Sequence, residues 1–318
     1  MKMELKLKFI YKMKKIILLL SASLLLSCTN NNKELNRKDF YFDTIISSTI
    51  YNSSDEHLTR INGIYSIYDK LSDNYLKRDI NNVYTINSSS DEVIVDSKLY
   101  ELLKLSYDIN LEIDYFNILC GTLAKKYKEA NNENKKLDEE IVNEELNNIK
   151  TTSIEFKENN VVRKSGKAEI DLGGIVKGYV LDKVKDYFSS NNISTYIIDA
   201  GSSSILLGNK NTKDGLFTIG LKDYKDGYLK EKECFISTSG NSTQGLHIVN
   251  PITGKLADNY DAVIVISNLG YIGDVLSTTF MLCSVDEIKS LESKYQVKSI
   301  VIKDNNIIYK NDNIKLYK

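Results

Sequence analysis

The chain is poor in several residue types that often build functional sites. It has no tryptophan, one proline, two histidines and four cysteines among 318 residues. The balance of 42 Lys and Arg against 43 Asp and Glu excludes a nucleic-acid protein that relies on bulk positive charge. A hydrophobic content of 42% excludes a disordered chain, and the composition also excludes a mini-protein and a polytopic membrane protein. The length allows one large domain or two small ones with a real core.

The cysteines do not indicate a disulfide framework or a metal centre. One of them, Cys28, closes an N-terminal apolar segment, and Cys120, Cys234 and Cys283 are widely separated. None lies in a CxxC or Cys/His metal spacing, and three isolated cysteines do not make a disulfide scaffold. We therefore expect buried thiols at these three positions.

The N-terminal segment has the pattern of an export signal. Six lysines precede the apolar run Ile16–Leu26, which is shorter than the roughly 20 residues needed to span a bilayer. The run ends in Leu-Leu-Ser-Cys28 and a polar stretch, which is similar to a bacterial lipobox whose cysteine is lipidated. A plain signal peptide or an N-terminal anchor with a coincidental cysteine is the alternative. We predict a lipoprotein signal peptide (1–27), a tether (28–39) and one domain (40–318), held by lipidated Cys28 on the extracytoplasmic side of the cell membrane.

Hydrophobic periodicity predicts mixed helices and strands without strict alternation. The predicted helices are Asp55–Leu71, one beginning near Ser97, a charged stretch Lys125–Lys150, one after Gly174, Gly273–Cys283 and Val285–Tyr295. The predicted strands are Phe40–Tyr51, Ile154–Phe156, Asn160–Lys164, Ala168–Leu172, Thr195–Ile198, Ser204–Leu207, Phe217–Leu221, Glu233–Ser237, Ala262–Ser267 and two short ones at the C-terminus. This order predicts an α+β fold with mixed, largely antiparallel sheets and packed helices.

The segment from Asp171 to Gly178 (DLGGIVKG) carries the strongest local signal for chemistry. A predicted strand ends in a glycine pair, and a helix follows. Glycines let the backbone approach a ligand closely, and the first N–H groups of a helix favour an anion. The pattern is neither GxGxxG nor a Walker P-loop. A tight structural turn with a surface lysine at Lys177 is the alternative.

A second signal lies in the helix predicted to begin at Gly273. Asp274, Ser277 and Thr278 share one helical face, because they stand at positions i, i+3 and i+4. A carboxylate and hydroxyl groups on one face could hold a hard cation such as Mg²⁺. An N-cap aspartate with back-bonding hydroxyls is the alternative.

Two further segments hold candidate residues. His247 lies in a stretch that follows Thr238-Ser-Gly240 and contains the only proline, and a histidine can act as a general base near neutral pH. The aromatic pair Tyr115-Phe116 precedes Asn117 and, with Tyr68, could enclose a planar ring. The alternatives are a hydrogen-bonded turn for the histidine and ordinary core packing for the aromatics.

Taken together and in this order, the motifs resemble those of the FAD:protein FMN transferases, the ApbE-like flavin transferase family. The family pattern DLGGIAKGY matches Asp171–Tyr179, TSG…HIIDPxTG matches Thr238–Gly254, and ADALST matches Gly273–Thr278. The stretch Ala200–Gly208 is also similar, and the resemblance runs from about Phe40 to the C-terminus. Each piece is weak alone, whereas the combination is specific.

The resemblance implies an enzyme that uses Mg²⁺ to split FAD and transfers FMN to a Thr or Ser hydroxyl of a target protein, with release of AMP. It implies a ligand role for the residues matched to the family pattern. Mg²⁺ would be held by the Gly174 carbonyl, the Asp274 carboxylate and the Thr278 hydroxyl. FAD would contact Phe42, Tyr68, Tyr115, Phe116, Asn117, Asp171, Lys177 and Ile248. His247 would position or deprotonate the acceptor hydroxyl, and Asp274 would be catalytic as well as a metal ligand.

The chain departs from the family pattern at two carboxylates. The usual GAFD is Asp114-Tyr-Phe-Asn117, and the usual HIIDP is His247-Ile-Val-Asn250-Pro251. These differences and a short segment before His247 bear on the acceptor and adenine contacts more than on the metal site. The resemblance implies that the acceptor is a membrane redox subunit or an extracellular flavoprotein. A Mg²⁺-dependent FAD pyrophosphatase that yields FMN and AMP, or a flavin-binding lipoprotein without catalysis, remains as an alternative.

Overall fold

Antiparallel strand pairing builds the main sheet of the molecule. The computed structural model describes residues 33–221, 224–241 and 245–318. Its large sheet has the order β1-β2-β6-β7-β10-β11-β12-β13, and every neighbouring pair is antiparallel. The strands are β1 (Glu34–Tyr41), β2 (Thr44–Tyr51), β6 (Tyr196–Ala200), β7 (Ser204–Leu207), β10 (Phe235–Gly240), β11 (Ala262–Ser267), β12 (Lys298–Lys303) and β13 (Asn306–Lys310).

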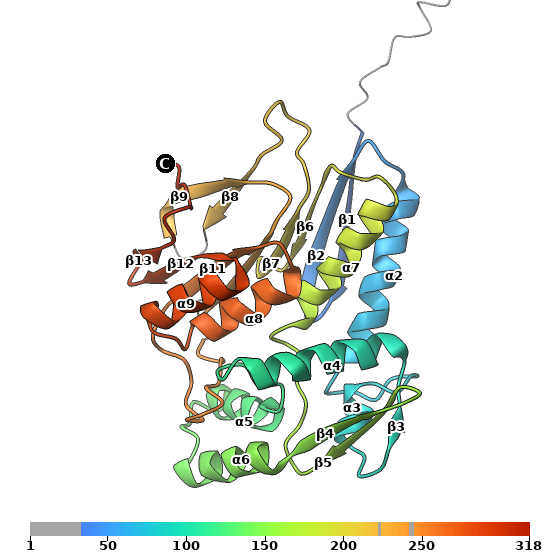
Figure 1. The fold of residues 1–318 in the computed structure, drawn as a ribbon, viewed down its shortest axis with the longest axis vertical. Helices are drawn as coiled ribbons and strands as arrows, with labels where there is room; N and C mark the ends of the chain where they lie inside the picture. The colour runs from blue at the N-terminus through green and yellow to red at the C-terminus, as the bar shows by residue number, and fades with distance from the viewer. Residues whose placement is uncertain (1–32, 222–223, 242–244) are drawn as a thin grey trace, which may run out of the picture. The chain divides into compact units, whose positions relative to one another are not determined.

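Helices and two small sheets complete the fold (Figure 1). The helices are α2 (Asp55–Ser72), α3 (Val83–Asn87), α4 (Ser97–Glu112), α5 (Gly121–Asn132), α6 (Glu139–Thr151), α7 (Val176–Ser190), α8 (Gly270–Phe280) and α9 (Val285–Tyr295). The small sheets are β3-β5-β4, formed by Val93–Ile94, Val161–Ser165 and Ser153–Lys157, and β8-β9, formed by Phe217–Leu221 and Tyr224–Glu231. The expected α+β class with antiparallel sheets is confirmed.

Strand β11 shows how the sheet separates two cores. All six of its residues are buried. Because successive side chains point to opposite faces, Val263 and Val265 enter the larger core on the helical side, while Ile264 and Ile266 enter a smaller core. The smaller core also holds Phe217 and Leu229 from β8 and β9, among others. Helices α2, α7, α8 and α9 lie along the other face of the sheet (Figure 1).

The structure corrects the predicted start of the domain. The predicted tether extended to Asp39, but β1 begins at Glu34, and the predicted strand Phe40–Tyr51 is a hairpin. Its turn is made by Phe42 and Asp43, both with positive φ (52° and 55°). Strand β1 is an edge strand with polar residues at many positions, so its composition resembles that of a linker. The predicted signal peptide and Cys28 lie outside the described residues.

Other element boundaries also differ from the predictions. The charged stretch 125–150 is not one helix, because Asn134 takes a left-handed conformation (φ 54°) between α5 and α6. Residues 168–172 form no strand. Instead, the Asn87 side chain bonds to both the N–H and the carbonyl of Ile170. Strand β9 was not predicted, and α8 begins at Gly270 and ends at Phe280. In the described part of the chain, no helix combines the length and apolarity needed to cross a membrane.

Candidate active site

The turn before α7 brings the DLGG segment against α8. Asp171 Oδ1 accepts a 2.7 Å hydrogen bond from the Gly173 N–H, which fixes the turn. A Cβ built on Gly174 would lie 3.4 Å from Phe116 Cε2 and 3.8 Å from Thr278 Oγ1. The structure therefore brings together Gly174, Phe116 and Thr278, which are far apart in the sequence.

Helices α7 and α8 cross at a pair of glycines. A Cβ on Gly178 would lie 2.1 Å from the Gly270 carbonyl oxygen, and a Cβ on Gly270 would lie 2.3 Å from the Gly178 carbonyl oxygen. A Cβ on Gly273 would lie 2.6 Å from Ser237 Oγ on β10. Only the absence of these side chains lets α8 approach both α7 and the sheet so closely.

Asp274 lies at this contact and is 6% exposed. Its Oδ1 accepts hydrogen bonds from the Ser204 and Ser237 hydroxyls, both at 2.7 Å, and its Oδ2 accepts one from the Gly178 N–H at 2.6 Å. Burial raises the pKa of the Asp274 carboxyl, and the Lys177 charge is the largest opposing influence. Asp274 stands inside α8, whose N-cap is Leu269, so the N-cap alternative is wrong.

Asp274, Gly174 and Thr278 supply oxygen atoms of the kind that a hard cation prefers. A carboxylate offers about four lone-pair positions, and the three donors to Asp274 leave one on Oδ2. The Gly178 N–H donates to Asp274 and not to the Gly174 carbonyl four residues earlier, so that carbonyl is not occupied by the usual helical bond. Thr278 Oγ1 lies 3.3 Å from Ser239 Oγ. Carbonyl, carboxylate and hydroxyl oxygens together suit Mg²⁺, which keeps several waters.

The metal site predicted from the family pattern has a single carboxylate. Among the described residues, no group of three or more His, Cys, Asp or Glu side chains stands close enough to hold a metal ion.

Of the predicted aromatic residues, Phe116 lies beside Gly174, Phe42 lies at a turn, and Tyr68 lies in the core. Phe42 lies at the β1–β2 turn, where its N–H donates to Asp69 Oδ1 at 2.7 Å, and Phe116 is buried beside Gly174. Tyr68 is 4% exposed and packs edge-on against Tyr179 of α7, with 5.6 Å between ring centroids. Tyr68 therefore occupies the core between α2 and α7, as the core-packing alternative describes.

The two neighbours of Phe116 are half-buried and hold local bonds. The Tyr115 hydroxyl donates to Glu287 Oε1 at 3.3 Å, which links this segment to α9. Asn117 Oδ1 accepts the Leu119 N–H at 2.8 Å and so holds the turn that leads to α5. Both contacts orient the segment around Phe116, while a flavin contact of either side chain stays a prediction.

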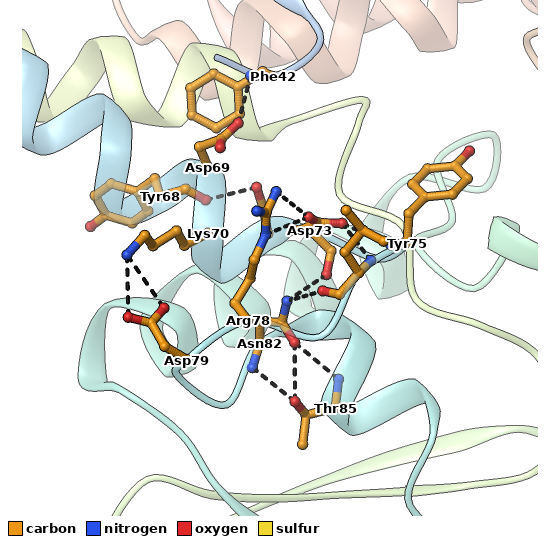
Figure 2. Close-up of polar contacts among 12 residues, drawn as sticks. Phe42, Tyr68, Asp69, Lys70, Asp73, Tyr75, Arg78, Asp79, Asn82 and Thr85 are labelled. Atoms are coloured by element: carbon orange, nitrogen blue, oxygen red, sulfur yellow. Dashed lines mark hydrogen bonds and ion pairs between the residues drawn. The ribbon is translucent and has the colours of Figure 1, made fainter. Parts of the chain in front are cut away.

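Tyr75, in the loop after α2, was not among the predicted site residues. Figure 2 shows how this loop is held: Asp73 accepts bonds from the Tyr75 N–H and from Arg78. The Tyr75 side chain is 49% exposed, and Lys125 Nζ lies 4.5 Å from its ring centroid. Burial and then the charges of Asp171 and Asp43 raise the pKa of the Tyr75 hydroxyl.

The hydrogen bonds of His247 and Ile248 are made to residues outside helices α7 and α8. His247 is exposed, and its Nδ1 lies 2.8 Å from the Gly245 carbonyl oxygen. Because a carbonyl only accepts, Nδ1 carries the proton and Nε2 is left as an acceptor. Ile248 is buried and its carbonyl accepts the Ala257 N–H. In residues 33–221, 224–241 and 245–318, the His247 ring makes no hydrogen bond to Asp274 or Thr278.

Comparison with solved structures shows the same fold. The ApbE protein of Thermotoga maritima matches with a TM-score of 0.74 and 23% identity, over 88% of this chain and 97% of that one. The flavin transferase ApbE of Vibrio cholerae matches with a TM-score of 0.69 and 20% identity, over 90% and 96% of the two chains.

Comparison of sequences points the same way. A FAD:protein FMN transferase of Klebsiella pneumoniae (strain 342) is 29% identical over 153 residues, which are 43% of this chain. The match spans about half of that relative, 46% of its length. The model of the ApbE family matches residues 42–301, a span that includes the α7–α8 contact and the His247 segment. This protein therefore belongs to the ApbE family.

Proposed function

We propose that this protein is a Mg²⁺-dependent FAD:protein FMN transferase. The observation that carries the proposal is the meeting of the α7 N-terminus with Asp274 and Thr278 of α8, beside Lys177. The partial positive charge of a helix N-terminus and a lysine attract a pyrophosphate, and the adjacent oxygen donors suit Mg²⁺. The family membership and the names of the relatives support the same activity.

The reaction replaces one phosphate bond by another. The acceptor hydroxyl oxygen bonds to the FMN phosphorus, the bond from that phosphorus to the bridging oxygen breaks, AMP leaves with that oxygen, and the hydroxyl proton is lost. Lys177 and the positive end of the α7 dipole would offset the charge on the phosphates. Bound Mg²⁺, held by the Gly174 carbonyl, Asp274 and Thr278, would supply electrophilic stabilisation of the same oxygens.

The remaining residues would bind and orient the substrates. Asp171 fixes the turn, and Tyr75 and Phe42 offer aromatic surface for the flavin or adenine ring, while Phe116 is buried beside Gly174. His247 has its Nδ1 proton directed to Gly245, so Nε2 is free to accept the proton of the acceptor hydroxyl. Holding that hydroxyl in line with the departing AMP would supply much of the rate.

We also propose that the mature protein is lipid-anchored through Cys28 on the extracytoplasmic side of the cell membrane. The residues up to Cys28 support this proposal, and a membrane redox subunit or an extracellular flavoprotein is the acceptor that such a location favours. Expression in a bacterial host tests the anchor. The wild-type protein should be in the membrane fraction, and Cys28→Ala should move it to the soluble extracytoplasmic fraction. A wild-type protein that is soluble would contradict the anchor.

Intact-mass spectrometry tests the activity. Residues 29–318 would be incubated with FAD, Mg²⁺ and a candidate acceptor domain from the same genome. We expect the acceptor to gain one FMN less one water, and AMP to appear in equal amount. Asp274→Ala and EDTA should abolish the gain, while Asp286→Ala, which removes an exposed carboxylate on α9, should not. Free FMN and AMP without an acceptor adduct would favour the pyrophosphatase, and bound, unchanged FAD would leave a flavin-binding protein.

A further inference from the structure

Helices α7 and α8 carry the same short pattern at the point where they cross. Residues 178–182 are Gly-Tyr-Val-Leu-Asp, and residues 270–274 are Gly-Tyr-Ile-Gly-Asp. In both helices the glycine lies in the first turn, and the aspartate follows one turn later. The glycine pair forms the closest backbone approach between the two helices.

The aspartate of each helix accepts hydrogen bonds from backbone N–H groups of the other helix. Asp274 of α8 accepts the Gly178 N–H of α7. Asp182 of α7 accepts the Gly270 N–H at 2.8 Å on Oδ1 and the Tyr271 N–H at 2.9 Å on Oδ2. Each carboxylate thus satisfies N–H groups in the first turn of the other helix, where no helical partner exists.

Neither helix has a cap of its own. The N-cap residues are Ile175 and Leu269, and neither makes a side-chain cap bond. Asp182 therefore replaces the missing cap of α8 from a different helix, and a carboxylate also suits the positive end of the α8 dipole. The position of α8 along α7 is then fixed by Asp182 on one side of the glycine pair and by Asp274 on the other.

We propose that Asp182 is a positioning residue that sets the geometry of the cation site through α8. The proposal rests on the proposed function, because it concerns the donor set of Gly174, Asp274 and Thr278. Asp182 does not contact these atoms. It fixes the first turn of α8, and Asp274 and Thr278 follow on the next two turns of the same helix. Lys177 and Asp182 both lie on α7. The bonds from Asp182 to the Gly270 and Tyr271 N–H groups therefore also fix the position of the cation donors on α8 relative to Lys177.

Asp182→Asn is the informative variant. Asparagine keeps the size of the side chain but offers only one acceptor oxygen, and its NH₂ group would face one of the two α8 N–H donors. The matched control is Asp186→Asn, one turn further along α7, where the aspartate is exposed. Asp182→Ser is the second variant, because a hydroxyl can still cap one N–H if Asp182→Asn does not fold.

The measurement is Mn²⁺ binding to residues 29–318 by electron paramagnetic resonance, with Mg²⁺ as competitor, together with thermal unfolding and FAD binding in EDTA. We expect Asp182→Asn to raise the Mn²⁺ Kd about 10- to 100-fold, the range found for residues that orient metal ligands indirectly. FAD affinity in EDTA should stay within a factor of two, and Asp186→Asn should change neither quantity.

The outcomes separate positioning from a purely structural role. If Asp182→Asn, or Asp182→Ser in its place, lowers the melting temperature but leaves the Mn²⁺ Kd within a factor of two, Asp182 is only a structural cap and the proposal is wrong. A wild-type protein that binds no Mn²⁺ would overturn both this proposal and the metal part of the proposed function. Wild-type binding with unchanged variants would overturn this proposal alone.

Discussion

Replacing Gly178 by alanine should separate the α7–α8 contact and destabilise the protein. The added Cβ would lie 2.1 Å from the Gly270 carbonyl oxygen and 2.9 Å from Asp274 Cγ. The first partner is backbone and cannot rotate away, so the helices must move apart by about 1.3 Å to reach an ordinary 3.4 Å contact. The 2.6 Å bond from the Gly178 N–H to Asp274 would be lost in the same movement.

The magnitude follows from three contributions. Overpacking in a well-packed contact costs about 1–3 kcal/mol. Loss of a hydrogen bond to a charged group costs about 1.5–3 kcal/mol. Alanine returns up to about 1 kcal/mol of helix propensity relative to glycine. The expected net change is a loss of about 3 kcal/mol in the free energy of unfolding.

Gly63→Ala is the matched control for this prediction. Gly63 lies in the interior of α2, is exposed, and its added Cβ would meet nothing within 4 Å. This variant should gain about 0.5–1 kcal/mol. Urea unfolding of residues 29–318, followed by circular dichroism, measures both variants. A Gly178→Ala midpoint equal to or above the wild-type midpoint would refute the close approach described for the two helices.

Three further predictions concern buried polar groups and thiols. Burial raises the pKa of Asp182 to about 6 from its usual 3.8, so its stabilising contribution is complete below about pH 4 and is lost as the pH rises through 6. The free energy of unfolding of the wild type relative to Asp182→Asn should therefore fall by about 1 kcal/mol between pH 5 and pH 7 in urea titrations, and a difference that rises over this range would contradict the assignment. Cys234 and Cys283 are buried, whereas Cys120 is half-buried, contrary to the expectation for that residue. Burial raises the thiol pKa of all three to about 12, so a thiol reagent at pH 8 should label residues 29–318 much faster after unfolding than before. Rapid labelling of Cys234 or Cys283 in the folded protein would contradict their burial. Glu292 is buried and accepts four hydrogen bonds from β12, β13 and the residue after β13, so Glu292→Ala should cost about 3 kcal/mol in urea unfolding, and a cost below 1 kcal/mol would show that these donors find other partners.

The sequence predicted the parts of the site that depend on short-range spacing. Asp274 and Thr278 stand one helical turn apart, so their common face could be predicted from the sequence alone. The same holds for the helix that follows Gly174. Their meeting at the Gly178–Gly270 crossing depends on residues more than 90 positions apart, and no local pattern specifies it. The repeated Gly-Tyr-x-x-Asp pattern was present but has a meaning only once the two helices are seen to cross.

Two aromatic residues show the limits of local patterns. Tyr68 was selected as a pocket residue, yet it continues the buried stripe of α2 that includes Ile61, Tyr65 and Leu71. Helical spacing therefore favoured the core position that it occupies. Tyr75 was not selected because its presentation depends on the bonds that Asp73 makes within an irregular loop. Strand β1 was missed because the polar composition of an edge strand also suits a linker.

The edge position of β1 has a mechanical consequence for the proposed lipid anchor at Cys28. Glu34 pairs with Tyr51 at the open end of the β1–β2 hairpin, whereas Tyr41 pairs with Thr44 beside the turn. A pulling force that reaches Glu34 would open these pairs one after another, because β1 is bonded on one side only. Eight residues at about 3.3 Å each would release roughly 26 Å of slack before the load reached the turn that holds Phe42. Strand β1 would thus unpair from β2 before the force reached the candidate site.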